Sequence, residues 1–554
     1  MERWRILAFS LLAPSVWLLA SCGNAAAPSD YPPQQMLERI TANGIRAHME
    51  FLADDLLEGR GTGTRGYQLA ANYIRAQFEQ MGLEPAGEGG TWFQKVRFRQ
   101  MTPVGERDSL VIKRGSSVEK LAFEKNFLME GDPAREDTAV EAPLVFVGYG
   151  VTAPERQYDD YAGVDTKGKI LVTVSGAPPN FPSSDRAVYS DEVVKFRNAV
   201  AHGAVGVIGV WAGEQTKNTP WAEIIRFFHQ PIMHWVDEKG VPNDYLPEIR
   251  GTAFINEPTA NELFKGAPHS FAEAFGSIRS GKPLSFSMGA SAAMHEAAHF
   301  AESESPNIAA VLRGSDPQLK NEYVIFSAHA DHVGIGEPVN GDAIYNGAVD
   351  NASGTAALLE IARALAESPV RPKRSVLFLA VAGEEEGLLG SDYYAQHPTV
   401  PAAQIVANVN MDGISLFYDF KDIVPLGAEH SSLNAQVHDV ARHMNLEVSP
   451  DPMPEENFFI RSDQFSFVKQ GIPALAISEG FKTVDPNLDG RKISVAWQTT
   501  HYHTPQDDMK QPLDFNAARL CTQVILAVGY EVANAPTRPT WNPGDMFGQR
   551  FGHH

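Results

Sequence analysis

The chain has 554 residues, of which 43% are hydrophobic and 21% are charged, so it is long enough to bury a large core and to form two or more domains. Its formal net charge is -22 and its pI is about 5.2. This charge argues against bulk binding of nucleic acid, because the phosphate backbone would be repelled. Most of the acidity is typical of a soluble surface, and a smaller part is expected in clusters of metal-binding carboxylates.

The N-terminus has the pattern of a bacterial lipoprotein signal. A charged start and an apolar run predict a signal peptide over residues 1–21, because the run is too short and wrongly flanked for a membrane span. The small residues before Cys22 resemble a lipobox, which implies cleavage before Cys22 and lipidation of its thiol. An ordinary secretory signal with an incidental cysteine is the alternative. Residues 22–34 are rich in Ala, Pro and Ser and predict a tether. Gly23 is not an Asp-type retention signal, so we expect an exported lipoprotein of the outer membrane, facing the periplasm or the cell surface.

The second cysteine, Cys521, lies in an apolar helix-like stretch and is expected to be a small core residue. An exported chain with one remaining cysteine has no internal disulfide. No cysteine is then available for a finger-type structural zinc site.

The spacing of apolar residues changes twice in the first half of the chain. Residues 35–83 have apolar positions at helical spacing, interrupted by a glycine-rich break at 58–64. The break lacks the Lys-Ser/Thr ending of a P-loop, so we assign it a structural role. Residues 92–127 alternate like strands. Residues 138–288 follow with strands, a helix and a Gly148-Tyr149-Gly150 turn, and they resemble the protease-associated (PA) domain.

The second half predicts an α/β fold. Apolar strands are expected at Tyr323–Ser327, Ser375–Val381, Ile405–Val409 and Ala474–Ile477, with a helix at Gly354–Glu367 between the first two. Alternating strands and helices predict a mostly parallel sheet covered on both faces. Residues 537–554 are rich in Pro and Gly and are expected to form a flexible tail.

Histidines and carboxylates follow these strands, where open α/β sheets build their sites. The segments are His329-Ala330-Asp331, Asp350-Asn351-Ala352-Ser353-Gly354, Glu384-Glu385-Glu386-Gly387, Asn410-Met411-Asp412 and Tyr502-His503-Thr504. Each is weak alone, since an Asp-Asn-Ser run can cap a helix and three glutamates can form a solvated turn. Together, they are the ligand types of a hydrolytic zinc pair.

These motifs, with Gly387-Leu388-Leu389-Gly390-Ser391 after the glutamates, resemble the di-zinc exopeptidases that include bacterial leucyl aminopeptidases, glutamate carboxypeptidase and the transferrin receptor. The resemblance implies a catalytic di-zinc peptidase domain over 289–536. Residues 35–137 would be the N-terminal part of this domain, and the PA domain would be inserted at 138–288.

The resemblance also implies two Zn²⁺ per chain. Asp350 would bridge both ions, His329 and Asp412 would complete one site, and Glu385 and His503 would complete the other. Such a pair lowers the pKa of a shared water towards neutrality.

Three further residues receive roles from the same resemblance. Glu384 is the expected general base, which takes the proton of the water and passes it to the leaving amine. Asp331 would be the partner that fixes the tautomer of His329. Tyr502 is a candidate oxyanion donor. The Asp350–Asn351 bond is expected to be a cis peptide.

Two assignments remain open when the residues are considered without the resemblance. Base and ligand could be Glu384 and Glu385 or Glu385 and Glu386, and the Gly-Leu-Leu-Gly-Ser sequence that follows favours the first choice. His501 competes with His503, which precedes the family ending Thr504-Pro505-Gln506-Asp507.

Two nearby side chains are left outside the ligand set. His332 is expected to line the cleft or form a hydrogen bond rather than bind metal. Arg461 could hold a substrate carbonyl or carboxylate, or form a core salt bridge.

The sequence therefore predicts an exported zinc aminopeptidase that acts on peptides and is attached to the membrane only through the lipid on Cys22. A carboxypeptidase of the glutamate-releasing type, a hydrolase of another amide or ester, and a receptor-like binding protein are the alternatives. Side-chain preference, the choice among zinc, cobalt and manganese, and the oligomeric state are not specified by the sequence.

Overall fold

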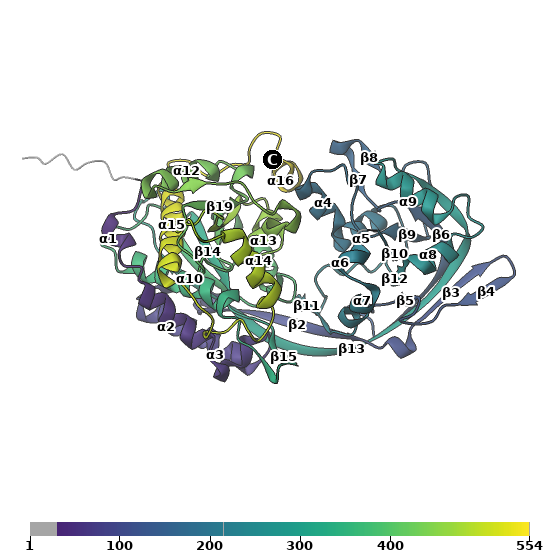
Figure 1. Cartoon of the computed structure of the whole chain (residues 1–554), viewed down its shortest axis with the longest axis horizontal. Coiled ribbons are helices and arrows are strands. Elements are labelled where there is room, and N and C mark those ends of the chain that lie inside the picture. Colours follow the sequence, from purple (N-terminus) through teal and green to yellow (C-terminus); the bar gives the residue numbers. More distant parts are fainter. Residues whose placement is uncertain (1–29, 214, 553–554) are drawn as a thin grey trace, which may run out of the picture.

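The computed structural model describes residues 30–213 and 215–552, which form two lobes joined by two long strands, β2 (Phe93–Pro103) and β13 (Ser285–Leu312) (Figure 1). The 28-residue strand β13 belongs to both sheets: residues 285–287 and 291–297 pair in the smaller lobe, and residues 298–312 pair in the larger lobe. The predicted signal peptide, Cys22 and most of the tether lie outside the described residues. Within the described residues, no helix is both long and apolar enough to cross a membrane.

The larger lobe contains a mixed sheet with a parallel centre. Four neighbouring strands, β17, β14, β18 and β21, run parallel, and the strands at both edges add antiparallel pairings. The order across the sheet is β11 (Ile232–Val236), β2, β13, β17 (Ser375–Val381), β14 (Tyr323–His329), β18 (Ile405–Asn410), β21 (Ala474–Glu479), β19 (Asp422–Leu426) and β20 (Glu447–Val448). The α/β prediction is confirmed, and the four predicted strands extend by at most two residues beyond their expected ends.

Helices cover both faces of this sheet, as the continuous apolar strands require. Along β17, Phe378 packs with the core on one face and Leu377 with the core on the other. The first face is covered by α2 (Ala42–Leu52), α3 (Arg65–Gln80), α10 (Gly354–Ala366), α12 (Leu433–Met444) and α15 (Phe515–Asn534), and the second by α11 (Leu389–Gln396), α13 (Gln464–Val468) and α16 (Met546–Phe551). Cys521 on α15 is a free, buried core residue, as expected.

The C-terminal segment differs from the flexible tail expected over 537–554. Helix α16 begins after Asp545, whose side chain accepts hydrogen bonds from the N–H groups of Phe547 and Gly548. Phe547 is fully buried, and the indole N–H of Trp541 donates to the carbonyl of Gly471. A six-residue helix surrounded by Pro and Gly carries too little periodicity to be recognised, although Phe547, Phe551 and the nearby Trp541 pack against the core of the second face.

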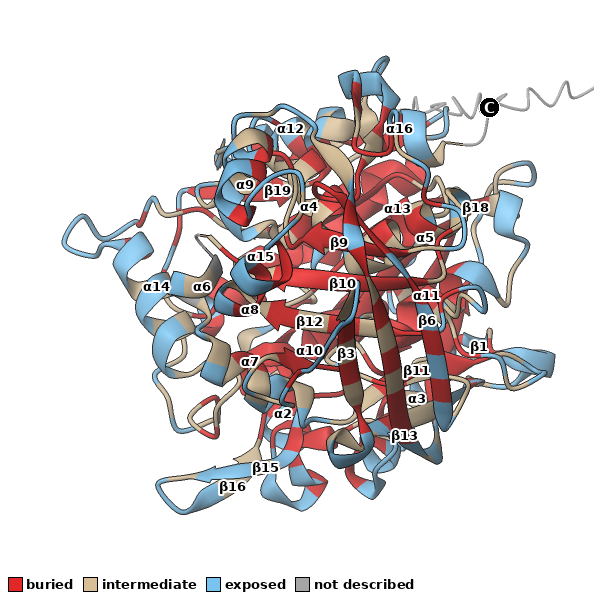
Figure 2. Cartoon of the chain, turned by 90° about the vertical axis from the view of Figure 1, so that its right-hand side faces the viewer, coloured by how far each residue is buried: buried red, intermediate tan, exposed pale blue. Residues whose placement is uncertain are grey.

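The smaller lobe is built on the first part of β13 (Figure 2). Its strand order is β4 (Ser117–Lys120), β3 (Ser109–Arg114), β13, β6 (Asp137–Val147), β9 (Ile170–Val174), β10 (Gly206–Trp211), β12 (Thr252–Asn256) and β5 (Phe127–Leu128). Helices α5 (Glu192–Ala201), α8 (Glu257–Leu263) and α9 (Phe271–Arg279) pack on it. The β-rich character matches the prediction, and the assignment as a PA domain stays a prediction.

The lobe boundaries differ from those expected at 138 and 288. Strands β3 to β5 precede residue 138, yet Leu110 and Phe127 pack in the core of the smaller lobe. Conversely, β11 lies inside the expected insert but pairs with β2 in the sheet of the larger lobe. Local alternation identifies a strand without saying which sheet it will join, because the partner strand is distant in sequence.

Candidate metal and active site

The predicted site residues meet at the carboxyl edge of the parallel strands. His329 is the last residue of β14, Asp412 comes two residues after β18, and Glu384 and Glu385 follow β17. Asp350 comes from the irregular turn Ala348–Ser353 that leads into α10. This edge is where α/β sheets place ligands, because the strand ends leave a crevice between the loops.

The first group of donors surrounds His329. Its Nε2 lies 3.2 Å from Oδ1 of Asp412 and 3.3 Å from Oδ1 of Asp350, and the imidazole is completely buried. These three ligand atoms lie close enough to one another to hold one metal ion.

The second group surrounds His503. Its Nε2 lies 3.2 Å from Oδ2 of Asp350 and 2.9 Å from Oε2 of Glu385. The two oxygens of Asp350 therefore face different groups, as a bridging carboxylate requires. The geometry brings together all five predicted ligands, while their ligation stays a prediction.

The donor set fits divalent zinc. Nitrogen from neutral imidazole and oxygen from carboxylate are zinc ligands, and neither group contains a thiol. Nε2 of His503 is buried, yet it forms no hydrogen bond of acceptable geometry despite its carboxylate neighbours. An orphaned nitrogen that faces two carboxylates is the arrangement expected where a cation completes the site.

The charges in the site are strongly coupled. Burial opposes protonation of His503, but Asp350 and Glu385 outweigh it and raise the pKa of this imidazole to about 10. Burial alone would raise the pKa of Asp350, but the contacts with His329 and His503 hold it well below its usual range. The carboxylates outnumber the imidazoles, so the apo site carries an excess of negative charge that metal cations would neutralise.

Asp350 is held by a neighbour that the sequence reasoning did not assign. The carboxylate of Asp507 accepts hydrogen bonds from the N–H groups of Val349 (2.9 Å) and Asp350 (3.0 Å). The expected cis peptide between Asp350 and Asn351 is present. Asn351 donates from Nδ2 to the carbonyl of Met411 at 2.9 Å, which links this turn to the end of β18.

Asp331 contacts His329 through its backbone rather than through its carboxylate. Nδ1 of His329 lies 3.3 Å from the backbone oxygen of Asp331 but 3.9 Å from its carboxylate. The carboxylate instead accepts hydrogen bonds from the N–H groups of Glu384 (3.3 Å) and Glu385 (3.4 Å) and from Thr62 (3.1 Å). Asp331 therefore orients His329 through its carbonyl, and its buried carboxylate positions the glutamate turn.

The three glutamates have different surroundings, which are consistent with the first register, and their roles stay predictions. Oε2 of Glu384 lies 4.0 Å from Nε2 of His329, Glu385 contacts His503, and Glu386 is exposed. Burial, with Asp412 and Glu385 nearby, raises the pKa of Glu384 well above its usual value. A carboxyl group with a raised pKa is suited to carry a proton.

His501 and His332, the two histidines left outside the predicted ligand set, differ in their contacts. The ring of His501 contacts Thr500, with 2.8 Å between Nδ1 and Oγ1. His332 is buried, and its Nδ1 lies 2.6 Å from Oε1 of Glu385, consistent with the expected hydrogen-bonding role. Its Nε2 has no partner, and its ring also lies close enough to Asp350 and Glu385 to be a metal ligand, an option that the sequence reasoning set aside.

The glycine-rich break at 58–64 supports the site from outside. Arg60 is buried and donates hydrogen bonds to the carbonyls of Ala330 (3.0 Å), Asn346 (2.6 Å) and Gly347 (2.9 Å). One guanidinium thus ties together the turns that carry His329 and Asp350. The structural role expected for this break is consistent with these contacts, but no pattern in the sequence pointed to the arginine.

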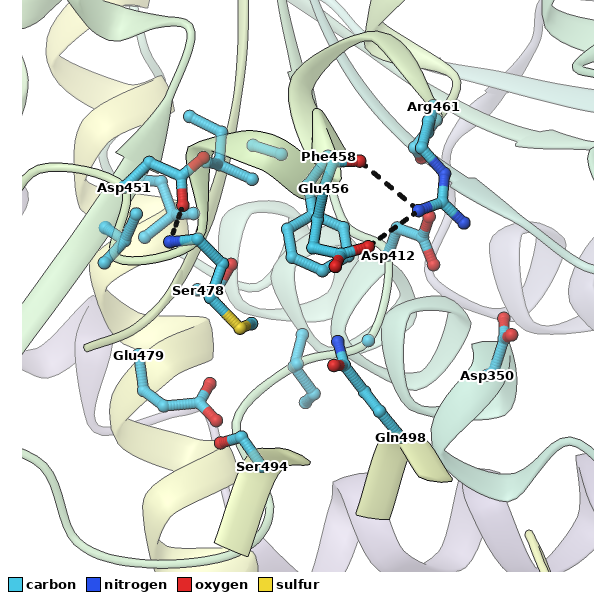
Figure 3. A pocket seen from close by; sticks show the side chains of 18 of the residues that line it. Asp350, Asp412, Asp451, Glu456, Phe458, Arg461, Ser478, Glu479, Ser494 and Gln498 are labelled. Carbon is cyan, nitrogen blue, oxygen red and sulfur yellow. Dashed lines mark hydrogen bonds and ion pairs between the residues drawn. The ribbon is translucent and has the colours of Figure 1, made fainter. Parts of the chain in front are cut away.

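A cavity of about 440 Å³ opens directly beside these residues. Asp350, Glu384, Asp412 and Tyr502 line one end, and Figure 3 shows Asp350 and Asp412 facing it. Arg461 also lines the cavity; its guanidinium lies 3.7 Å from Oε2 of Glu456 and half of its side chain is exposed, so it is not a core salt bridge.

The chain is similar to known peptidases. Residues 307–529 match the model of peptidase family M28. These residues form an M28 peptidase domain. The chain is 27% identical over 263 residues to a probable zinc metalloprotease of Pyrenophora tritici-repentis (42% of this chain, 58% of the relative). It is 30% identical over 227 residues to aminopeptidase Y of Saccharomyces cerevisiae (40% of this chain, 37% of the relative).

The matched part of the chain spans about half the length of the curated relatives. Among solved structures, the aminopeptidase from Aneurinibacillus sp. strain AM-1 covers 93% of this chain and 99% of its own, with 20% identity and a TM-score of 0.50. This likeness extends over both lobes and supports the fold.

Proposed function

We propose that the protein is a zinc-dependent aminopeptidase that removes N-terminal residues from peptides. The observation that carries this proposal is the pair of imidazole–carboxylate groups that share Asp350, with Glu384 beside them, inside the M28 domain. Relatives named zinc metalloprotease and aminopeptidase support the same activity.

Two zinc ions fit the donor set. His329, Asp350 and Asp412 would hold one, and Asp350, Glu385 and His503 would hold the other. When bound, the ions supply Lewis acidity and lower the pKa of water towards neutrality. His332 contacts Glu385 and would fix the orientation of that carboxylate.

Glu384 is the general base in this proposal. Its carboxylate lines the cavity, so it can take a proton from water on the side where the peptide enters and return the proton to the leaving amine. The α-ammonium of the substrate needs negative partners, and the carboxylates of Glu384 and Asp412, which line this end of the cavity beside Asp350, are its proposed partners. Burial and the nearby carboxylates of Asp350 and Glu385 raise the pKa of Tyr502, so its phenol stays protonated and can donate to a developing oxyanion.

The proposal also covers the cellular location of the enzyme and the role of the smaller lobe. We infer from the lipobox pattern that the enzyme is exported and anchored through Cys22. The smaller lobe, as a PA domain, would restrict the entry to small or unfolded peptides. Labelling with a radioactive fatty acid that disappears in a Cys22→Ala variant would support the anchor, and unchanged labelling would contradict it.

The direct test uses the protein that begins after Cys22. Release of the first residue is measured from free and N-acetylated peptides, with and without a chelator. We expect cleavage of free N-termini only, abolished by the chelator and restored by zinc. Release of C-terminal residues would instead favour the glutamate-carboxypeptidase alternative, and absence of bound metal would favour the receptor-like one.

Variants at the glutamates test the roles within the site. Glu384→Gln is expected to lower kcat by about 10²–10⁴-fold with unchanged metal content. Glu386→Gln, at the exposed neighbour, is the matched control and should retain activity. Tyr502→Phe is expected to lower kcat by about 10²-fold or more with little change in KM. An unchanged kcat in either active-site variant would exclude the role proposed for that residue.

A further inference from the structure

The cavity continues well beyond the candidate metal residues. Its walls are largely apolar and include Phe417, Leu426, Met453, Phe458, Ile477 and Trp497. Such a chamber would accept the side chain of a residue bound at the metal end, because apolar walls favour burial of methylene and aromatic groups.

The far end of the chamber is polar. Figure 3 shows Glu479 and Ser494 across the cavity from Asp350 and Asp412. Glu479 is the last residue of β21, so the rigid sheet fixes its position. Ser494 lies on α14 (Gly490–Thr500), and its hydroxyl is 3.3 Å from the hydroxyl of Tyr418.

The carboxylate of Glu479 lacks a cationic partner among the described residues. The nearest basic residue in sequence, Lys482, pairs with Glu447 at 2.7 Å instead. Arg461, the basic residue in the lining of the chamber, is paired with Glu456. Burial, with the nearby carboxylate of Asp422, raises the pKa of Glu479, so ionisation of this group carries a free-energy cost that a cation beside it would offset.

A ligand that relieved this cost would carry an apolar stem and a positive end. Lysine and arginine have this form, since their methylene stems pack on apolar walls while the charged group reaches a polar partner. A second carboxylate, Asp451, lines the same chamber and strengthens the preference for a cation. A leucine side chain would bury the walls equally well but would leave Glu479 without a cationic partner.

We propose that this chamber selects peptides whose first residue is lysine or arginine, with Glu479 as the residue that pairs with the side-chain cation. The proposal rests on the aminopeptidase activity proposed above. The α-ammonium would bind beside Glu384 and Asp412, and the side chain would extend along the apolar walls to Glu479.

The test compares substrates that differ in charge but hardly in shape. Values of kcat/KM are measured for peptides that begin with arginine or citrulline, and with lysine or norleucine. We expect the cationic member of each pair to be preferred by at least about tenfold, equivalent to about 1.4 kcal/mol. In Glu479→Gln this ratio should fall to about one or below. Glu447→Gln removes a carboxylate outside the chamber and should keep the wild-type ratio.

The remaining outcomes each decide one question. Equal rates within the pairs, or a preference that survives in Glu479→Gln, would overturn the selection by Glu479. A preference that follows the second residue of the peptide, seen by comparing Lys-Ala with Ala-Lys, would overturn the assignment of the chamber to the first residue. Failure to cleave any free N-terminus would instead overturn the aminopeptidase proposal. The metal content and thermal unfolding of each variant show whether it is folded.

Discussion

Each lobe contains a cluster of buried carboxylates, and the two clusters differ in their neighbouring side chains. In the larger lobe, Asp350 and Glu385 contact the imidazoles of His329 and His503. In the smaller lobe, Glu296 on β13 lies near Asp108, Glu130 and Asp132. Among the described residues, Asp132 forms an ion pair with Arg135, and the other three acids form none.

The difference appears in the direction of the pKa shifts. In the larger lobe, burial and Asp350 would raise the pKa of Glu385, but His332 and His503 outweigh them and hold it at about 2, whereas the pKa of Glu384 rises. In the smaller lobe, burial raises the pKa to about 8 for Glu296, about 7 for Glu130 and about 6 for Asp108. Buried acids that face imidazoles stay ionised and can bind cations, while buried acids that face each other retain protons.

The largest effect is expected from removing the shared carboxylate. Asp350→Asn leaves both groups without their common charged ligand. We expect loss of bound metal and a fall of kcat/KM by more than about 10³-fold. The metal content is measured by elemental analysis beside activity and circular dichroism. An active variant with the wild-type metal content would mean that the two groups do not share this ligand.

A smaller effect is expected from the carboxylate that positions the glutamate turn. Asp331→Asn keeps the shape of the side chain but weakens its hydrogen bonds to the N–H groups of Glu384 and Glu385. Mutation of residues that hydrogen-bond to metal ligands typically lowers metal affinity or activity by about 10–100-fold, so we expect kcat/KM to fall within this range. The pH profile of kcat should also shift, since Glu384 moves relative to its neighbours. A profile identical to wild type would limit Asp331 to a purely structural role.

The smallest effect on activity is expected in the smaller lobe, where the prediction concerns stability. Because the folded-state pKa of Glu296 is raised to about 8, the folded protein keeps a proton that the unfolded chain has lost. The stabilisation is complete below the unfolded pKa and is lost as the pH rises through about 8. Unfolding by denaturant should therefore become easier between about pH 5 and pH 8.

Glu296→Gln removes this proton-linked term. The variant should flatten the pH dependence of the free energy of unfolding, with a change of about 1–3 kcal/mol at neutral pH or above. Its kcat at fixed pH should remain close to wild type, because Glu296 lies outside the candidate site. A pH dependence as steep as in wild type would assign the effect to the other acids of the lobe.

The chain's order of residues determines the chemistry of the candidate site. Short apolar strands with a histidine or carboxylates at or shortly after their ends, as at His329 and Glu384, predict both a parallel sheet and the edge at which the donors meet. The Gly-Leu-Leu-Gly-Ser run after the glutamates, through the resemblance that it carries, favours the register in which Glu384 is the base and Glu385 a ligand. These features are local, so they can be recognised without knowledge of distant contacts.

Tertiary structure decided what depends on partners far apart in sequence. Strand β11 joins the sheet of the larger lobe, and α16 packs through Phe547, because segments distant in the sequence provide their surfaces. The support of the site by Arg60 has the same origin, since its hydrogen-bond acceptors lie about 270 residues along the chain. The chamber that ends at Glu479 is formed by loops and helices that no local pattern connects. Spacing along the chain specifies which groups lie at a strand end, but only packing specifies what those groups face.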